Sequence, residues 1–386
     1  MPDISTIPFW GRGFRPFFLG AAAYAALDLL LWIAVHLGWL GSFPVTVTVG
    51  WHAHEMIYGF AMAVVSGFLL TAVANWTGWS PVRGYHLLGL FLLWLVGRLV
   101  MLWPDLPPYL VLTIESAFIP ALAVSLFVPL YKTRNIRNYV FLMLLTMLFA
   151  LDVHYLLLGE MRALHVAIIV LMVMISLVGG RIIPAFTVSA LRQRGLELRN
   201  IDQPKLDRLA LASWLVVAVL IWVGDAQGSL TALAAFAAAT IHLLRMRHYH
   251  TAKALIDPLL WVLHVAYLWL IIGLLLLGVG AMGWISPAPI WHAFTVGALG
   301  SATLGMMSRV ALGHTGRPLR CHPLIILAFW LIQISVLCRV VGILLMSEHY
   351  FMLLAVSGLC WSAAFMFYLL IYVPMLLRPR PDGNPA

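Results

Sequence analysis

Apolar residues in this chain occur in long runs that are interrupted only by short polar segments. An α-helix of about 20 apolar residues is long enough to cross the hydrocarbon core of a bilayer. Of the 386 residues, 63% are hydrophobic and 10% are charged, whereas a soluble domain has about 25% charged residues. The sequence therefore predicts an all-α integral membrane protein and excludes a soluble monomer.

The apolar runs predict twelve transmembrane helices in a single polytopic membrane domain, residues 1–386. Arg12 and Arg15 precede the first span without a cleavable signal, so this span is expected to be an uncleaved anchor. The longest polar stretch, Leu191–Arg208, is expected to be a loop between two six-span halves. The spans are predicted near 14–40, 51–76, 84–103, 108–131, 138–159, 162–187, 206–224, 229–245, 257–281, 288–312, 320–346 and 350–377.

Basic residues are concentrated in alternate loops. The N-terminus, the loops after the even-numbered spans and the C-terminus contain nearly all of them, and the opposite loops contain Arg162. Lys and Arg favour the cytoplasmic side of a membrane protein. The pattern therefore predicts that both termini are cytoplasmic, and it accounts for the net charge of +9 without a nucleic-acid partner.

Two predicted spans begin and end alike. Trp51-His52-Ala53 leads to Thr77-Gly78 after 26 residues, and Trp291-His292-Ala293 leads to Thr315-Gly316 after 24. These are the second and tenth spans, and the sixth also opens with a histidine, His165. The spacing of four spans suggests three pseudo-repeated four-helix arcs. Chance similarity among Gly- and Leu-rich helices is the alternative.

The 14 histidines equal the Asp and Glu residues in number. An ionisable group inside a bilayer indicates function, and imidazole is the commonest metal ligand. A b-type haem needs one or two imidazoles at matched depth, and several histidines lie near the periplasmic ends of their spans. Interfacial or solvated histidines are the alternative. The candidate haem or metal ligands are His52, His54, His292, His264 and His314, with His165 and His154 as weaker candidates.

The segment His52-Ala53-His54-Glu55 is the most informative local pattern. Residues two apart on a helix differ by about 200°, so the two imidazoles point to opposite faces and could ligate separate centres. Glu55 is the candidate catalytic residue, because it could carry protons into an apolar region or orient a ligand. The alternative is an interfacial cluster at a helix N-terminus.

Arg98 and Arg339 lie inside predicted spans, near their periplasmic ends. A buried guanidinium needs a partner, and haem propionates are suitable bidentate acceptors. Internal ion pairs with Asp152 and Glu115 are the alternative. The three cysteines form no CxxCH signature, so a haem would be held non-covalently.

Several motifs together resemble the NnrS family, and they extend from the first predicted span to the eleventh. They are Gly13-Phe14-Arg15-Pro16-Phe17-Phe18, Trp51-His52-Ala53-His54-Glu55-Met56, Gly67-Phe68-Leu69-Leu70-Thr71-Ala72, Asn75-Trp76-Thr77-Gly78, Gly179-Gly180-Arg181-Ile182-Ile183-Pro184, Leu263-His264 with Tyr267, His292-Ala293-Phe294-Thr295-Val296-Gly297, and Arg309 with Gly313-His314-Thr315-Gly316-Arg317.

The resemblance implies a twelve-span protein of the bacterial inner membrane that carries haem b and copper and is tied to nitric oxide in denitrification or nitrosative stress. The family motifs include the histidines at 52, 54, 264, 292 and 314 and the glutamate at 55, but His165 lies outside the motif of its span. At the level of fold alone, the layout is also similar to the main subunit of haem–copper oxidases. Their His-x-His pair, however, lies on the tenth span rather than the second.

Three functions follow as hypotheses. The first is an oxidoreductase that reduces NO to N2O with electrons from a quinol or another membrane donor. The second is a non-catalytic haem/copper protein that senses or sequesters NO, or protects iron from it. The third, a transporter of a metal or small solute, is ranked last, because the central glycines of the spans lack the prolines typical of broken helices.

Overall fold

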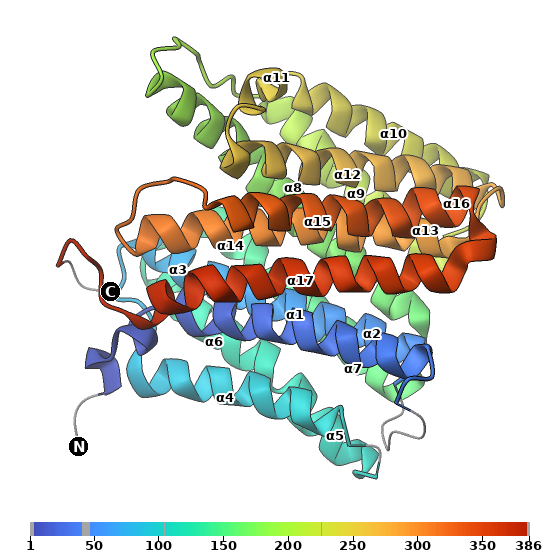
Figure 1. Cartoon of the computed structure of the whole chain (residues 1–386), viewed down its shortest axis with the longest axis horizontal. Coiled ribbons are helices and arrows are strands. Elements are labelled where there is room, and N and C mark those ends of the chain that lie inside the picture. Colours follow the sequence, from blue (N-terminus) through green and yellow to red (C-terminus); the bar gives the residue numbers. More distant parts are fainter. Residues whose placement is uncertain (1–3, 41–46, 104, 225, 384–386) are drawn as a thin grey trace. The chain divides into compact units, whose positions relative to one another are not determined.

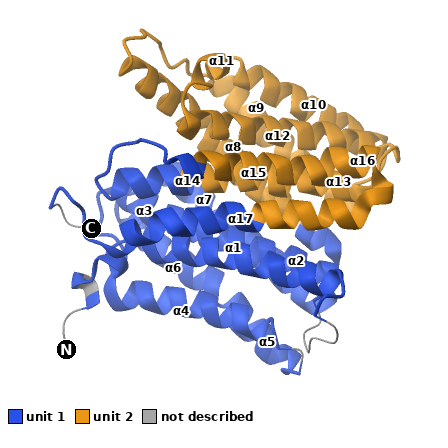
Figure 2. Ribbon diagram, viewed as in Figure 1, with its two compact units in different colours: residues 1–164, 307–325, 362–386 blue, residues 165–306, 326–361 orange. Residues whose placement is uncertain are grey.

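The computed structural model describes residues 4–40, 47–103, 105–224 and 226–383. All regular structure in these ranges is helical, which confirms the all-α prediction (Figure 1). The chain divides into two compact units, shown in Figure 2. Unit 1 comprises Met1–Leu164, Met307–Ile325 and Ser362–Ala386, and unit 2 comprises His165–Met306 and Ile326–Trp361.

Each unit combines segments that are far apart in sequence, so neither is a sequential domain. No unit boundary falls in the loop at 191–208, where the sequence suggested a division into two halves. The division into units leaves the single-domain description of residues 1–386 as a prediction.

The helices of unit 1 come mainly from the first part of the chain. Parts of α8, α14, α15 and α17 also belong to this unit, because its boundaries fall inside these helices. Its helices are α1 (Phe14–His36), α2 (Val49–His54), α3 (Met62–Thr77), α4 (Gly84–Val100), α5 (Pro108–Ser116), α6 (Phe118–Lys132) and α7 (Tyr139–Leu158).

Unit 2 is built from the central part of the chain and a segment near its C-terminal end. Its helices, with those that it shares, are α8 (Met161–Arg192), α9 (Pro204–Gly224), α10 (Ser229–Met246), α11 (Thr251–Ala254), α12 (Pro258–Ala281), α13 (Pro287–His292), α14 (Ser301–His314), α15 (Pro323–Leu337), α16 (Ile343–Leu345) and α17 (Tyr350–Leu377).

Proline and glycine mark many of the helix ends. Helices α5, α9, α12, α13 and α15 begin with proline, whose fixed φ and missing N–H suit the first helical position. The side chain of Asp257 also caps α12 by accepting from the backbone N–H of Leu259. Gly78 and Gly159 end α3 and α7 in the left-handed conformation, which favours glycine.

Ten helices of the described residues are long and apolar enough to cross a membrane. Helix α4 is apolar but has only 17 residues. The predicted span near 288–312 is helical throughout, but it is not among the ten. Neither the count of twelve nor the three repeated arcs is confirmed.

Large apolar side chains are exposed along these helices, while ionisable side chains are buried. Val223 is 76% exposed and Leu233 is 67% exposed, whereas Arg15 and Glu55 are 0% exposed. Buried ionisable groups together with many exposed large apolar ones are unusual in a soluble protein. With the ten apolar helices, this distribution indicates a multi-pass membrane protein.

Three π-helical segments interrupt the α-helices. They are η3 (Glu55–Ala61), η5 (Ala293–Gly300) and η6 (Cys338–Gly342). Such segments are rare and often occur at functional sites. Here they contain Glu55 and Arg339, and two of them begin directly after His54 and His292. The π segments therefore coincide with residues that the sequence selected on chemical grounds.

Candidate functional site

Five ionisable side chains of unit 1 form one buried cluster. His54 ends α2, Glu55 begins η3, and the other three come from α4, α5 and α7. Their residues are between 0% and 3% exposed. We refer to His54, Glu55, Arg98, Glu115 and Asp152 as the buried charged cluster.

Glu55 is the centre of this cluster. Its Oε2 accepts from Nη1 of Arg98 at 2.7 Å and from the hydroxyl of Tyr24. Its Oε1 lies 2.8 Å from Nδ1 of His54. Both oxygens are therefore hydrogen-bonded, which stabilises a carboxylate in an apolar bundle.

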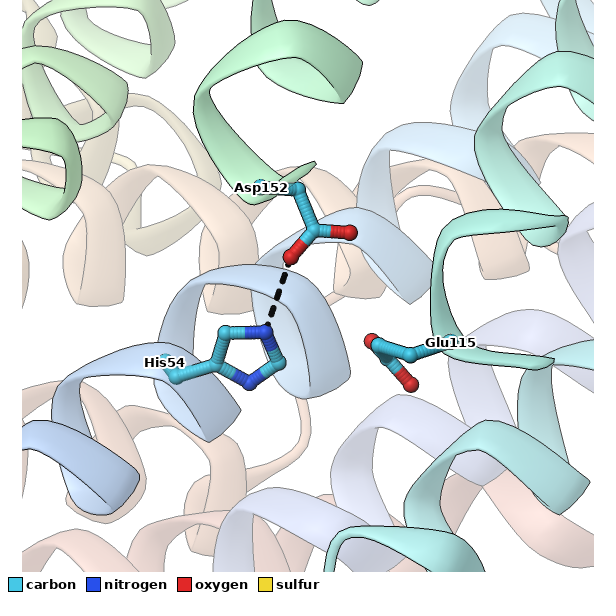
Figure 3. A group of neighbouring side chains, drawn as sticks. All are labelled: His54, Glu115 and Asp152. Carbon is cyan, nitrogen blue, oxygen red and sulfur yellow. Dashed lines mark hydrogen bonds and ion pairs between the residues drawn. The ribbon is translucent and has the colours of Figure 1, made fainter. Parts of the chain in front are cut away.

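The imidazole of His54 lies between two carboxylates. Its Nε2 is 2.9 Å from Oδ1 of Asp152, and its Nδ1 faces Glu55. Figure 3 shows the Asp152 contact, with the carboxylate of Glu115 near the same ring. One ligand atom each from His54, Glu115 and Asp152 lie within 4.8 Å of one another.

Arg98 joins the two acidic sides of the cluster. In addition to Glu55, it contacts Oε1 of Glu115 through Nη2. This is the ion-pair alternative that the sequence left open for Arg98. The role in binding a haem propionate is not tested by these contacts and stays a prediction.

The directions of the helices explain why these residues meet. His54 lies near the start of one apolar helical segment and Glu115 near the start of another, whereas Arg98 and Asp152 lie near the ends of theirs. Successive crossings run in opposite directions, so these positions share one end of the bundle. Gly97 makes room there, because a Cβ at this position would lie 2.5 Å from Oε2 of Glu115.

His52 contacts a different part of unit 1 from His54. Its ring stacks on Trp32 of α1, with centroids 4.3 Å apart, and Trp32 also stacks on His36. His54 instead contacts α7 through Asp152. The two imidazoles therefore meet different helices, in agreement with the prediction from their spacing.

In unit 2, the structure brings His292 and Arg339 together. Nδ1 of His292 is 2.7 Å from the carbonyl oxygen of Ala288, and Nη2 of Arg339 is 3.1 Å from Nε2 of His292. A carbonyl can only accept, so Nδ1 carries the proton and Nε2 has the lone pair. Nη1 of Arg339 is buried and has no hydrogen-bond partner among the described residues.

Two other predicted ligands of unit 2, His165 and His264, contact different residues from those that contact His292. His165 stacks on Trp291, with ring centroids 4.0 Å apart. His264 is buried, and its two nitrogens lie 2.9 Å and 3.0 Å from the hydroxyls of Thr187 and Thr251. Hydroxyls satisfy both nitrogens of His264, so no second metal-ligating side chain joins it within the described contacts.

The two remaining predicted ligands lie in unit 1. The ring of His314 is 5.6 Å from that of Phe14, and its backbone carbonyl accepts from Arg380. His154 lies 3.1 Å from Glu160, which also pairs with Arg162. The Arg162 guanidinium holds the pKa of Glu160 below its usual range. His154 therefore belongs to a partly exposed ion-pair group at the end of α7.

Sequence reasoning missed Tyr24 and Asp28 of α1. Tyr24 donates to Glu55, and Asp28 is 4% exposed with no hydrogen-bond partner for either oxygen among the described residues. The signal for Asp28 was present, because a carboxylate within an apolar run of 23 residues is unusual in itself.

The loop-charge pattern did not show that His242 and Arg245 are buried. His242 is 0% exposed, and its Nδ1 is 2.8 Å from the hydroxyl of Tyr267. Arg245 is 3% exposed and pairs with Asp207 at 2.7 Å. Both lie in the last turns of α10, where packing against neighbouring helices, invisible in a loop-charge pattern, buries them.

The pair His292 and Arg339 fits a haem. A ligating histidine usually donates its second N–H to a carbonyl or carboxylate, as His292 does. The buried Nη1 of Arg339 requires an acceptor, which an anionic propionate would provide. Copper fits less well, because Cu(I) favours soft ligands. The three-ligand group found among the described residues instead has one imidazole and two carboxylates.

Together these features define a multi-pass helical membrane protein with buried imidazole, carboxylate and guanidinium groups. The chain belongs to the NnrS family, because the family described as NnrS protein matches residues 8–380. A search of curated proteins finds no match. Family membership associates the chain with the response to nitric oxide and with binding of a metal or haem.

Proposed function

We propose that this protein is a haem- and copper-containing oxidoreductase of the bacterial inner membrane that reduces nitric oxide. In the reaction, two NO take up two electrons and two protons and give N2O and water. A bound haem b, with copper, would supply NO binding and electron transfer, and a quinol or another membrane donor would supply the electrons. The observation that carries the proposal is the hydrogen-bonded chain of proton-holding groups buried among apolar helices.

Glu55 is the proposed proton-carrying residue. It is hydrogen-bonded to Tyr24, His54 and Arg98, so a proton that reaches any of these groups has a short path to its carboxylate. Arg98 stabilises the carboxylate after the proton leaves. A reaction that consumes two protons inside a membrane needs a route of this kind, because the surrounding hydrocarbon holds no water.

His292 and Arg339 are the proposed haem-binding pair of unit 2. Nε2 of His292 would ligate the iron, and Arg339 would bind a propionate. His52, which stacks on Trp32, is a further candidate ligand. NO is apolar and small, so it can enter from the bilayer without a polar channel.

The first experiment is a pyridine-haemochrome spectrum and a metal analysis of the purified protein, followed by N2O measurement with NO and a quinol donor. We expect b-type haem and steady N2O production. Absence of haem absorbance would overturn the proposal. If NO binds to the haem without N2O release, the protein sequesters or senses NO and does not reduce it.

Variants assign the roles. His292→Ala and Arg339→Gln are expected to lose haem, whereas His349→Ala, at an exposed position, is expected to keep it. Glu55→Gln is expected to keep haem but to lower the rate of N2O formation by about 10²–10⁴-fold, the usual contribution of a positioned proton donor. An unchanged rate in Glu55→Gln would exclude Glu55 from proton delivery.

A further inference from the structure

We propose that His54, Glu115 and Asp152 bind one divalent cation of the manganese, iron or zinc type. The site lies within unit 1 and does not depend on the reaction proposed above. It adds a metal that is neither haem iron nor copper, held by a ligand group that the sequence alone did not bring together.

The distances suit a single cation. Nitrogen and carboxylate ligands bind such cations at about 2.0–2.2 Å, so opposite ligands are about 4.4 Å apart at most. The three ligand atoms lie within 4.8 Å of one another, and Nε2 of His54 and Oδ1 of Asp152 are 2.9 Å apart. A movement of a few tenths of an ångström would bring all three into range, and Figure 3 shows both carboxylates close to the ring.

The unsatisfied oxygens of the two carboxylates are the second observation. Oε2 of Glu115 and Oδ2 of Asp152 are buried and have no hydrogen-bond partner among the described residues. The two residues are only 3% and 1% exposed, so bulk solvent does not reach these oxygens. A buried oxygen of this kind costs several kcal/mol unless a proton or a cation meets it.

The charge balance indicates a divalent cation. The hydrogen-bonded cluster contains three carboxylates (Glu55, Glu115 and Asp152) and one guanidinium (Arg98). With His54 neutral, as a ligand must be, two negative charges remain. One divalent cation balances them inside a region where an unpaired charge is very costly.

Glu55 supports the ligand role of His54. Its Oε1 lies 2.8 Å from Nδ1, so in the metal-bound state Nδ1–H would donate to Glu55 and the deprotonated Nε2, which faces Asp152, would be the ligating nitrogen. A carboxylate behind the ligating histidine is a common feature of metal sites. One imidazole and two carboxylates suit Mn²⁺, Fe²⁺ or Zn²⁺ better than Cu(I).

The test is the metal content of the purified protein and of two variants, Glu115→Gln and Asp152→Asn. We expect about one equivalent of Mn, Fe or Zn beyond the haem iron in the original protein. Loss of a ligand should lower the affinity for added Mn²⁺ at least as much as loss of a supporting residue does, about 10–100-fold. The titration is followed by the EPR signal of free Mn²⁺.

The exposed carboxylate of Glu348 provides the control, and Glu348→Gln is expected to bind Mn²⁺ like the original chain. If a variant fails to fold, Mn²⁺ titration of the chelator-treated original protein still tests whether the cation site exists. Binding of one Mn²⁺ there, with a higher unfolding temperature, supports the site. No binding overturns it, and so does a metal content in which copper alone is lost in the variants.

Discussion

At the scale of single residues, the cluster around Glu55 depends on opposite charges that face each other inside the protein. Arg98 contacts Glu55 and Glu115, and His54 lies between Glu55 and Asp152. Breaking a buried pair leaves an uncompensated charge, whereas an exposed pair contributes little. Whether an ion pair is buried or exposed therefore matters more for stability than how many ion pairs the protein has.

Arg98→Met should therefore destabilise the protein strongly. The substitution leaves Glu55 and Glu115 buried without their shared guanidinium, at a cost of about 3–5 kcal/mol. Chemical unfolding in detergent measures the change. Arg320→Met, at an exposed position, is the control and should change the stability by about 0.5 kcal/mol or less.

Haem content distinguishes the two roles considered for Arg98. If Arg98 acts only as an ion-pair partner, the Met variant loses stability but the folded fraction keeps its haem. Loss of haem from a variant as stable as Arg320→Met would instead show that Arg98 holds a propionate.

At the scale of elements, the site is set by breaks in regular helices and by close helix contacts. The π segments η3, η5 and η6 change the direction of side chains next to His54, His292 and Arg339. Helix α4 approaches Glu115 closely at Gly97, whereas a Cβ added at Gly89 of the same helix would meet no atom within 4 Å. These two glycines form a matched pair.

Gly97→Ala is expected to displace the carboxylate of Glu115, because the new Cβ would lie 2.5 Å from Oε2. Overpacking of this kind costs about 1–3 kcal/mol, and the displaced ligand should also weaken Mn²⁺ binding. Gly89→Ala should leave binding unchanged and stabilise the helix by about 0.5–1 kcal/mol. Equal Mn²⁺ affinities in the two variants would contradict this account of Gly97.

At the scale of the whole molecule, the positive charges predict how the chain crosses the membrane. The proposed topology has both termini in the cytoplasm, which requires an even number of crossings. Cysteine labelling with a membrane-impermeant maleimide tests it in a background without Cys321, Cys338 and Cys360.

Two exposed positions report on the two sides of the membrane. Ser347→Cys, between the last two predicted spans, should be labelled in intact cells, because this loop is predicted to be periplasmic. Gln193→Cys, in the polar loop after α8, should be labelled only after lysis. The opposite result at both positions would reverse the topology, and labelling of both in intact cells would contradict the odd number of crossings predicted between them.

The sequence determined the class of this protein by itself. A bilayer requires a helix of a certain length and apolarity to cross it, and this requirement appears in the sequence as apolar runs. Such runs therefore predict membrane-crossing helices even when the packing is unknown. The chemical candidates were also visible, because an ionisable residue such as Glu55 or Arg339 stands out in an apolar run. The family motifs also include Glu55.

Only the tertiary structure decided which of these residues meet. Glu115 and Asp152 lie far from His54 along the chain, and helix packing alone brings their ligand atoms together. Packing likewise buries His242 and Arg245. Hydrophobicity is a property of each segment and can be read locally, whereas a ligand group depends on how helices pack side by side and on where a π turn or a glycine lets them approach.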